Sequence, residues 1–138
     1  MKFATNELQK QKITYHVVSL GQLEAGENRD VILSAKIVNH LAKEQDVPLC
    51  FLIVDFKFNF CVISLYHANK SLVEDNHLKA GDEILVKNPD VIFTSLQFQG
   101  RLYAYQTVKV TDITNILVNG QPLVDRQAKT QLVTNTFV

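Results

Sequence analysis

The stretch CFLIVDFKFNFCVISLY, residues 50–66, decides the fold, because two apolar runs flank a short interval, FKFN. Runs rich in β-branched and aromatic residues on either side of such an interval predict a β-hairpin. A strand pair with one wet face alternates apolar and polar residues, and this pair hardly does. The hairpin is therefore expected to need a cover on both of its faces.

The register of this hairpin fixes which side chains share a face. With residues 56–59 as the turn, Val54 pairs with Cys61 and Leu52 with Ile63. The wholly apolar face is then the expected core: Cys50, Leu52, Val54, Cys61, Ile63 and Leu65. The opposite face is aromatic and apolar, without Lys or Arg: Leu49, Phe51, Ile53, Asp55, Phe60, Val62, Ser64 and Tyr66. A shift of one residue in the turn would scramble these two sets.

Three covers for this second face stay open. Residues 13–20 or 113–118 of the same chain could lie over it. A protein partner could dock on it, with Phe51, Ile53, Phe60, Val62 and Tyr66 as the candidate contacts. Single-stranded nucleic acid could stack there, although the basic groove that such binding uses is missing from this face.

The remaining strands are expected at residues 31–41, 83–87, 91–98 and 101–110, with a short helix or loop before Gly81. This order predicts an all-β protein, a five-stranded OB-fold barrel with a short helix or loop between strands 3 and 4. SH3-like barrels have similar strand counts but usually lack that link. The expected domain spans residues 13–123, between a tail or linker at residues 1–12 and a C-terminal tail at residues 124–138.

A second hairpin around Gln99-Gly100 carries the best nucleic-acid candidates. A two-residue turn pairs Phe98 with Arg101, Leu96 with Tyr103 and Thr94 with Tyr105. One face then combines aromatic rings with cations, the mixture that binds single strands: Phe98, Arg101, Tyr103, Tyr105 and Lys109. Ordinary packing of alternating aromatic residues is the competing explanation.

The composition limits the kinds of partner and cellular compartment that can be expected for this chain. The 14 basic and 14 acidic residues cancel, so no net charge draws the chain toward nucleic acid or acidic lipid. No apolar run is long enough for a membrane span, and the first residues lack a signal-peptide core. Two cysteines without a signal peptide suggest a reducing compartment, and we expect the cytoplasm or the nucleus.

Enzymatic chemistry is not indicated. The sequence has no phosphate-binding Gly-rich loop and no nucleophile elbow. The cysteines are too far apart on the predicted hairpin for a disulfide, and we expect two buried free thiols. Asp55 is interpreted as a turn residue that accepts backbone N–H groups, and Asp82 as a residue that serves the turn into the strand at 83–87. No catalytic residue, cofactor or metal site is predicted.

Several phrases resemble one known family. They include GENRDVILSAKIV at residues 26–38, GDEILVKNPD at 81–90, GRLYAYQTVKV at 100–110 and TNILVNGQPL at 114–123. In this order they are similar to the C-terminal OB-fold domain of the tetratricopeptide repeat protein 5 (Strap) family, from about Val17 to Leu123. The chain departs from that family at Phe56-Lys57-Phe58-Asn59, where the family has a Gly-containing turn. It also has no 34-residue helical repeat of its own.

The resemblance implies a non-enzymatic adaptor in stress-response transcription with acetyltransferase coactivators, or at the ribosome. The family's recognition of nascent tubulin belongs largely to the helical repeats and does not transfer to this chain. The implied partner is a protein, such as a helical-repeat domain or a coactivator, and a single-stranded DNA or RNA ligand is the alternative. The chain is either one domain of a larger protein or a stand-alone relative, and its oligomeric state is left open.

Overall fold

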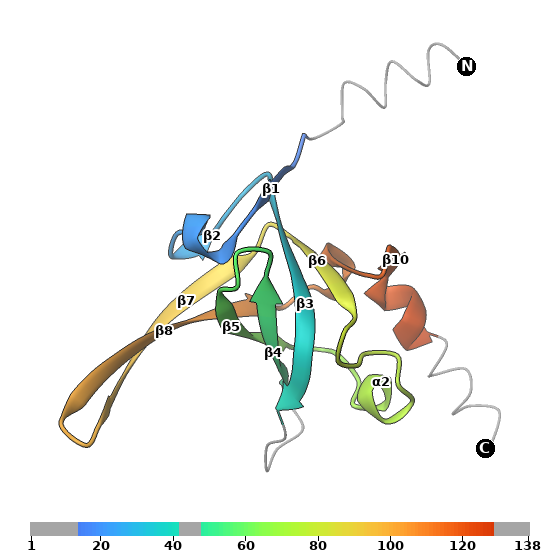
Figure 1. Ribbon diagram of the computed structural model, residues 1–138. Helices are drawn as coiled ribbons and strands as arrows, with labels where there is room; N and C mark the ends of the chain where they lie inside the picture. Colours follow the sequence, from blue (N-terminus) through green and yellow to red (C-terminus); the bar gives the residue numbers. More distant parts are fainter. Residues whose placement is uncertain (1–13, 42–47, 129–138) are drawn as a thin grey trace.

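The computed structural model describes residues 14–41 and 48–128 (Figure 1). The expected tail at residues 1–12 and the last ten residues lie outside this part of the chain. Among the described residues, no helix has the length and apolar character needed to cross a lipid bilayer.

Strands dominate the described chain. The first half holds β1 (His16–Val18), the 3-10 helix η1 (Leu20–Gln22), β2 (Gly26–Glu27), β3 (Val31–Leu41), β4 (Leu49–Asp55) and β5 (Phe60–Leu65). The second half holds α2 (Ser71–Glu74), β6 (Glu83–Lys87), β7 (Asp90–Phe98), β8 (Arg101–Val110), η2 (Ile113–Asn115), β9 (Ile116–Val118) and β10 (Gln121–Pro122). A further helical segment occupies residues 123–128.

The described strands form one sheet in the order β10-β9-β6-β3-β4-β5-β8-β7-β2, with β1 parallel to β3. Its centre has the expected OB-fold connectivity, because β3 pairs with both β4 and β6 while β5 runs parallel to β8. The short helix α2 lies between β5 and β6, as predicted. No register joins β6 to β8 among the described strands, so the barrel is open on that side.

The core lies on one face of this curved sheet. β3, β4 and β5 contribute Leu33, Ile37, Leu49, Phe51, Ile53, Ile63 and Leu65 to it. Three short helical segments add Leu20, Leu72 and Leu123, each 2% exposed or less. The cluster also includes Val18, Ile113 and Ile116, so the described residues 14–20 and residues 113–118 do help to cover the first hairpin, on the side of Phe51 and Ile53.

The predicted register of the first hairpin is wrong by one residue. Val54 pairs with Phe60, and Phe51 pairs with Ile63. The turn is a three-residue loop in which Asp55 N donates to Asn59 O at 2.9 Å and Phe58 adopts a left-handed φ of 63°. Because side chains alternate along a strand, this shift moves Phe51 and Ile53 into the core, where they are 1% and 0% exposed.

The second hairpin follows the predicted register. Phe98 pairs with Arg101, Leu96 with Tyr103 and Thr94 with Tyr105. Gln99 and Gly100 have φ values of 51° and 77°, as a tight two-residue hairpin turn requires. The far part of this hairpin projects from the body of the molecule, and we call residues 92–106 the arm (Figure 1).

The C-terminal segment differs from the expected tail at its start. Residues 123–128 are helical, and Leu123 is completely buried. Arg126 Nη1 donates to the carbonyl of His77 at 2.7 Å, and Gln127 Nε2 donates to that of His67 at 3.3 Å. These contacts attach the segment to the link that contains α2.

Candidate binding face

The proposed protein-docking residues separate into two groups. Phe51 and Ile53 belong to the core, so the expectation that they form an accessible face is wrong. Phe60 is 59% exposed, and Val62 and Tyr66 are partly buried. Phe60 and Val62 therefore remain available for contact with a partner.

The proposed nucleic-acid residues share a face, as the confirmed register requires. Phe98, Tyr103 and Tyr105 are between 46% and 57% exposed, and Arg101 is also exposed. Lys109 lies farther along β8, near the body of the molecule, with its Nζ 5.3 Å from the centre of the Tyr66 ring. A cation over an aromatic ring is stabilising, and here it holds Lys109 beside Tyr66 rather than beside the rings of the arm.

The protein-docking candidates that stay exposed and the nucleic-acid candidates of the arm lie on one surface. β5 and β8 are parallel, with Val62 beside Thr107 and Ser64 beside Lys109, so these partners project from the same face. On β4, Leu52 and Val54 pair with Val62 and Phe60 and extend this face. We define the outer face by six residues: Leu52, Phe60, Val62, Tyr103, Tyr105 and Phe98.

A groove of about 560 Å³ divides the outer face where the arm separates from β5. The first pairing of β5 with β8 is Val62 with Thr107, so the strands have already diverged at Phe60. Phe60 and Val62 line one wall, and Ala104, Tyr105 and Gln106 line the other. Phe93 and Leu20 also line it, so the groove offers a largely apolar lining to a ligand.

Asp55 organises the turn beside this groove. One carboxylate oxygen accepts from Leu20 N at 2.8 Å, and the other accepts from Lys57 N at 3.0 Å and Asn59 N at 2.8 Å. Burial alone would raise the pKa of Asp55, but these bonds stabilise the charged form and lower its pKa overall. The expectation that Asp55 serves the turn is confirmed.

The same turn exposes two aromatic rings. Phe56 is 57% exposed and Phe58 is 83% exposed. A bulky residue at positive φ is strained, and Phe58 has no burial to offset that strain. Both rings lie in the interval FKFN, which the sequence already sets apart as a departure from the resembling family.

Asp82 plays a similar part before β6, as predicted. Its carboxylate accepts from Lys79 N at 3.0 Å, from Lys79 Nζ at 3.2 Å and from Asn119 Nδ2 at 3.1 Å. Burial opposes ionisation here too, yet the hydrogen bonds and the Lys79 charge lower the pKa of Asp82 overall. Asp82 thus joins the α2 link to the loop after β9.

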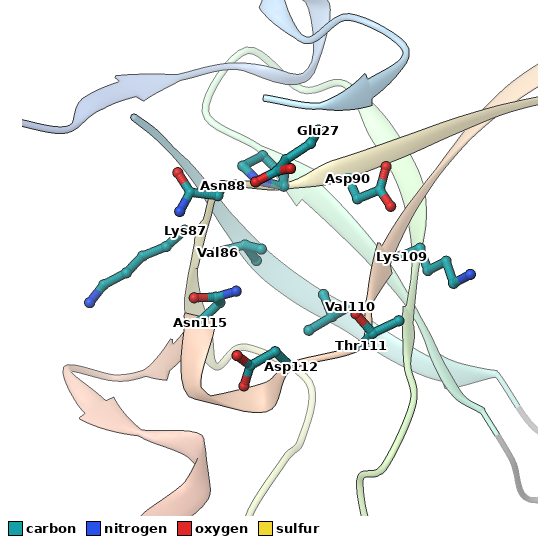
Figure 2. A pocket seen from close by; sticks show the side chains of 11 residues that line it. Glu27, Val86, Lys87, Asn88, Asp90, Lys109, Val110, Thr111, Asp112 and Asn115 are labelled. Carbon is teal, nitrogen blue, oxygen red and sulfur yellow. The ribbon is translucent and has the colours of Figure 1, made fainter. Parts of the chain in front are cut away.

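A smaller polar pocket of about 260 Å³ lies away from the groove (Figure 2). Glu27, Asp90, Asp112, Lys87 and Lys109 line it, so its charges have both signs. Figure 2 shows the Lys87 and Lys109 side chains extending in opposite directions, away from the pocket centre. Asp112 accepts from Thr114 N and Oγ1, which lower its pKa. The charged side chains of this pocket therefore do not converge on a common point.

The described residues contain no group of three or more His, Cys, Asp or Glu side chains that could hold a metal ion. Both cysteines are buried free thiols. Burial and the nearby Asp55 charge raise the pKa of Cys61 to about 12, which keeps it protonated and unreactive. Cys50 Sγ lies 3.4 Å from Ser64 Oγ.

The strand order and the exposed outer face define the class of protein as an OB-fold domain with a surface suited to binding. Comparison with known families gives the particular family. A model described as the tetratricopeptide repeat protein 5 OB fold domain matches residues 14–132, and the chain belongs to this family.

Individual relatives are similar over the same region. Tetratricopeptide repeat protein 5 of Homo sapiens and that of Bos taurus are each 27% identical over 112 residues, and that of Mus musculus is 26% identical. The alignment covers 81% of this chain but 24% of each relative. The chain thus spans about a quarter of the length of the curated relatives that it matches.

Proposed function

We propose that this chain is a non-enzymatic docking module that binds a helical-repeat protein through its outer face. One observation carries the proposal: two sets of side chains, assigned separately to protein and to nucleic acid, form one apolar surface with a groove. Large exposed apolar patches on soluble domains mark interaction sites. The three relatives are named for tetratricopeptide repeats and are about four times longer than the matched region, which supports a repeat segment as the partner.

The test is a binding titration against the tetratricopeptide-repeat region of the human relative. Phe60→Glu places a charge on the wall of the groove without touching the core, and binding should weaken at least about tenfold. Val17→Glu is the matched control, since Val17 is 61% exposed but lies on β1, outside the outer face. Equal binding by wild type and Phe60→Glu, or no binding by wild type, would contradict the proposal.

For the cellular setting, the resemblance to the family supports a proposal. We place the module in stress-response transcription with acetyltransferase coactivators or in ribosome-linked regulation, in the cytoplasm, the nucleus or both. Localisation of a fluorescently tagged chain before and after stress, with sedimentation of ribosomes from the same cells, would separate the two settings. A tagged chain that neither enters the nucleus nor sediments with ribosomes would contradict both.

Single-stranded nucleic acid is the second candidate ligand. The arm supports it with Phe98, Tyr103 and Tyr105 on the same face as Arg101, since stacking rings beside a cation suit single strands. The pairing of Lys109 with Tyr66 and the absence of net charge favour protein instead. Fluorescent DNA and RNA strands of about 20 nucleotides, titrated across a salt series, decide between them.

A nucleic-acid complex should show a steep salt slope that becomes smaller in Arg101→Ala. Absence of binding at low salt would leave protein docking as the function of the outer face.

A further inference from the structure

The arm has a free backbone edge on β8. Phe98 and Arg101 flank a two-residue turn, so they form a hydrogen-bonded pair, and such pairs recur at every second residue. The N–H and C=O groups of the intervening Leu102 and Ala104 therefore point away from β7. β5 joins β8 only from Thr107 onward, and no other strand among the described residues pairs with this edge.

The groove beside this edge can receive another strand. Ala104, Tyr105 and Gln106 form its wall on the side of the arm, so the free backbone groups of Ala104 border the groove directly. Its volume of about 560 Å³ gives a second strand room to lie against β8. Phe60 and Phe93 line the same groove and offer apolar contacts to the strand's side chains.

We propose that a second copy of this chain adds its own β8 to this edge, antiparallel, and forms a two-fold symmetric dimer. With the two-fold axis at Tyr103, Leu102 of each copy faces Ala104 of the other, and the outward groups of both residues are satisfied. Tyr103 then faces its own counterpart. Arg101 faces Tyr105 of the second copy, an arrangement that favours a cation–π contact and opposes no like charges.

The composition of the arm supports association with the arm of a second copy of the chain. Natural edge strands are usually protected by charge, proline or a bulge, whereas Arg101 is the one charged residue between positions 91 and 108. Its exposed large apolar side chains are Ile92, Phe93, Phe98, Leu102, Tyr103 and Tyr105. Leu102, Tyr103 and Tyr105 lie on β8 itself, so the two copies bring six exposed apolar or aromatic side chains to the strands that pair.

This dimer goes beyond the proposed docking function, because it depends on the free backbone edge of β8, although it shares the groove and the Tyr103 and Tyr105 side chains with the outer face. The two ideas can fail separately. Phe60→Glu tests the docking of helical repeats, whereas substitutions on the arm that alter only its backbone edges test the dimer.

The first experiment measures the mass of the full chain by sedimentation equilibrium over a wide concentration range. Ala104→Pro removes an N–H that points into the groove and leaves the ladder within the arm intact, so association should weaken at least about tenfold. Ser95→Pro is the matched control. Ser95 pairs with Ala104 across the hairpin, and its N–H points out of the opposite edge, so this variant should dimerise like wild type. A wild type that stays monomeric, or an Ala104→Pro variant that dimerises normally, would overturn the proposal.

The second experiment tests the register without a proline. Tyr103→Cys places two thiols opposite each other at the two-fold axis, and mild oxidation should link the copies covalently. Arg101→Cys should not cross-link, because its thiol faces position 105 of the other copy. The native cysteines are both buried and do not compete. Equal cross-linking of both variants, or of neither, would exclude this dimer.

Discussion

Asp55 shows how much of this fold depends on a single carboxylate. It ends β4 facing the inside of the barrel and binds Leu20 N of η1 together with the turn amides of Lys57 and Asn59. It therefore connects two segments that are distant in sequence. The predicted register was wrong because it placed residues 56–59 in the turn, whereas Asp55 N donates to Asn59 O and closes a three-residue loop.

We predict that Asp55→Ala lowers the free energy of unfolding by about 2 kcal/mol, since hydrogen bonds to a charged group are lost and Leu20 N–H is left buried without its acceptor. Urea denaturation followed by circular dichroism measures this change. Asp125→Ala is a suitable control, because Asp125 is an exposed carboxylate in the helical segment at residues 123–128. A loss below about 0.5 kcal/mol, no larger than for an ordinary surface substitution, would show that the carboxylate does not organise the turn.

Asp55 and Asp82 also predict the response to acid. Both pKa values are lowered from an ordinary value of 3.8, so both carboxylates stabilise the folded state while they are ionised. Their contribution is complete above the unfolded-state value and is lost as the pH falls through the lower folded-state values. Denaturation between pH 7 and pH 2 should therefore show steady stability down to about pH 5 and a decline below about pH 4. The decline should be shallower in Asp55→Asn, and an unchanged slope would contradict this origin.

At the scale of elements, the two hairpins differ in how far sequence predicts them. Gln99-Gly100 permits essentially one tight turn, so the pairing of β7 with β8 follows directly from the sequence. FKFN permits a loop of three or four residues, and either choice gives an apolar face. The choice depends on the left-handed conformation of Phe58 and on the contact of Asp55 with η1, and neither can be predicted from local sequence.

The register of the first hairpin can be tested by a matched pair of substitutions. Phe51→Ala should lower the free energy of unfolding by about 3–5 kcal/mol, because it empties a fully buried site. Phe60→Ala should change it by less than about 1 kcal/mol, because that ring is largely exposed. Thermal denaturation of both variants gives the comparison. The register predicted from sequence, with Phe60 and Phe51 on one face, would make the two effects similar.

At the scale of the whole molecule, the OB-fold order and most strand bounds could be predicted from sequence. β3 and β4 begin and end where their β-branched and aromatic runs do. The described residues 14–20 are largely β-branched and aromatic, yet His16–Val18 is strand and Leu20–Gln22 turns as η1. The helical segment at 123–128 was missed because its sequence is mostly polar, and its attachment depends on Leu123 and on carbonyls of the distant α2 link.

That attachment predicts where the domain ends. A chain that stops after Pro122 should lose about 3 kcal/mol of unfolding free energy relative to one that stops after Ala128, because Leu123 and the bond from Arg126 to His77 are removed. Denaturant titration of the two shortened chains measures the difference. Equal stability would place the functional end of the domain before the helical segment.

The parallel pairing of β5 with β8 also has a consequence for the order in which the parts of the domain fold. β4 with β5 and β7 with β8 are neighbours in sequence, so each hairpin can form within microseconds. The join of Val62 to Thr107 requires both hairpins and the chain between them to meet, and such non-local pairing is slow. We therefore expect the two halves of the outer face, and the groove between them, to form together in a late step of folding. A newly made chain acquires its binding surface only when the whole domain is complete.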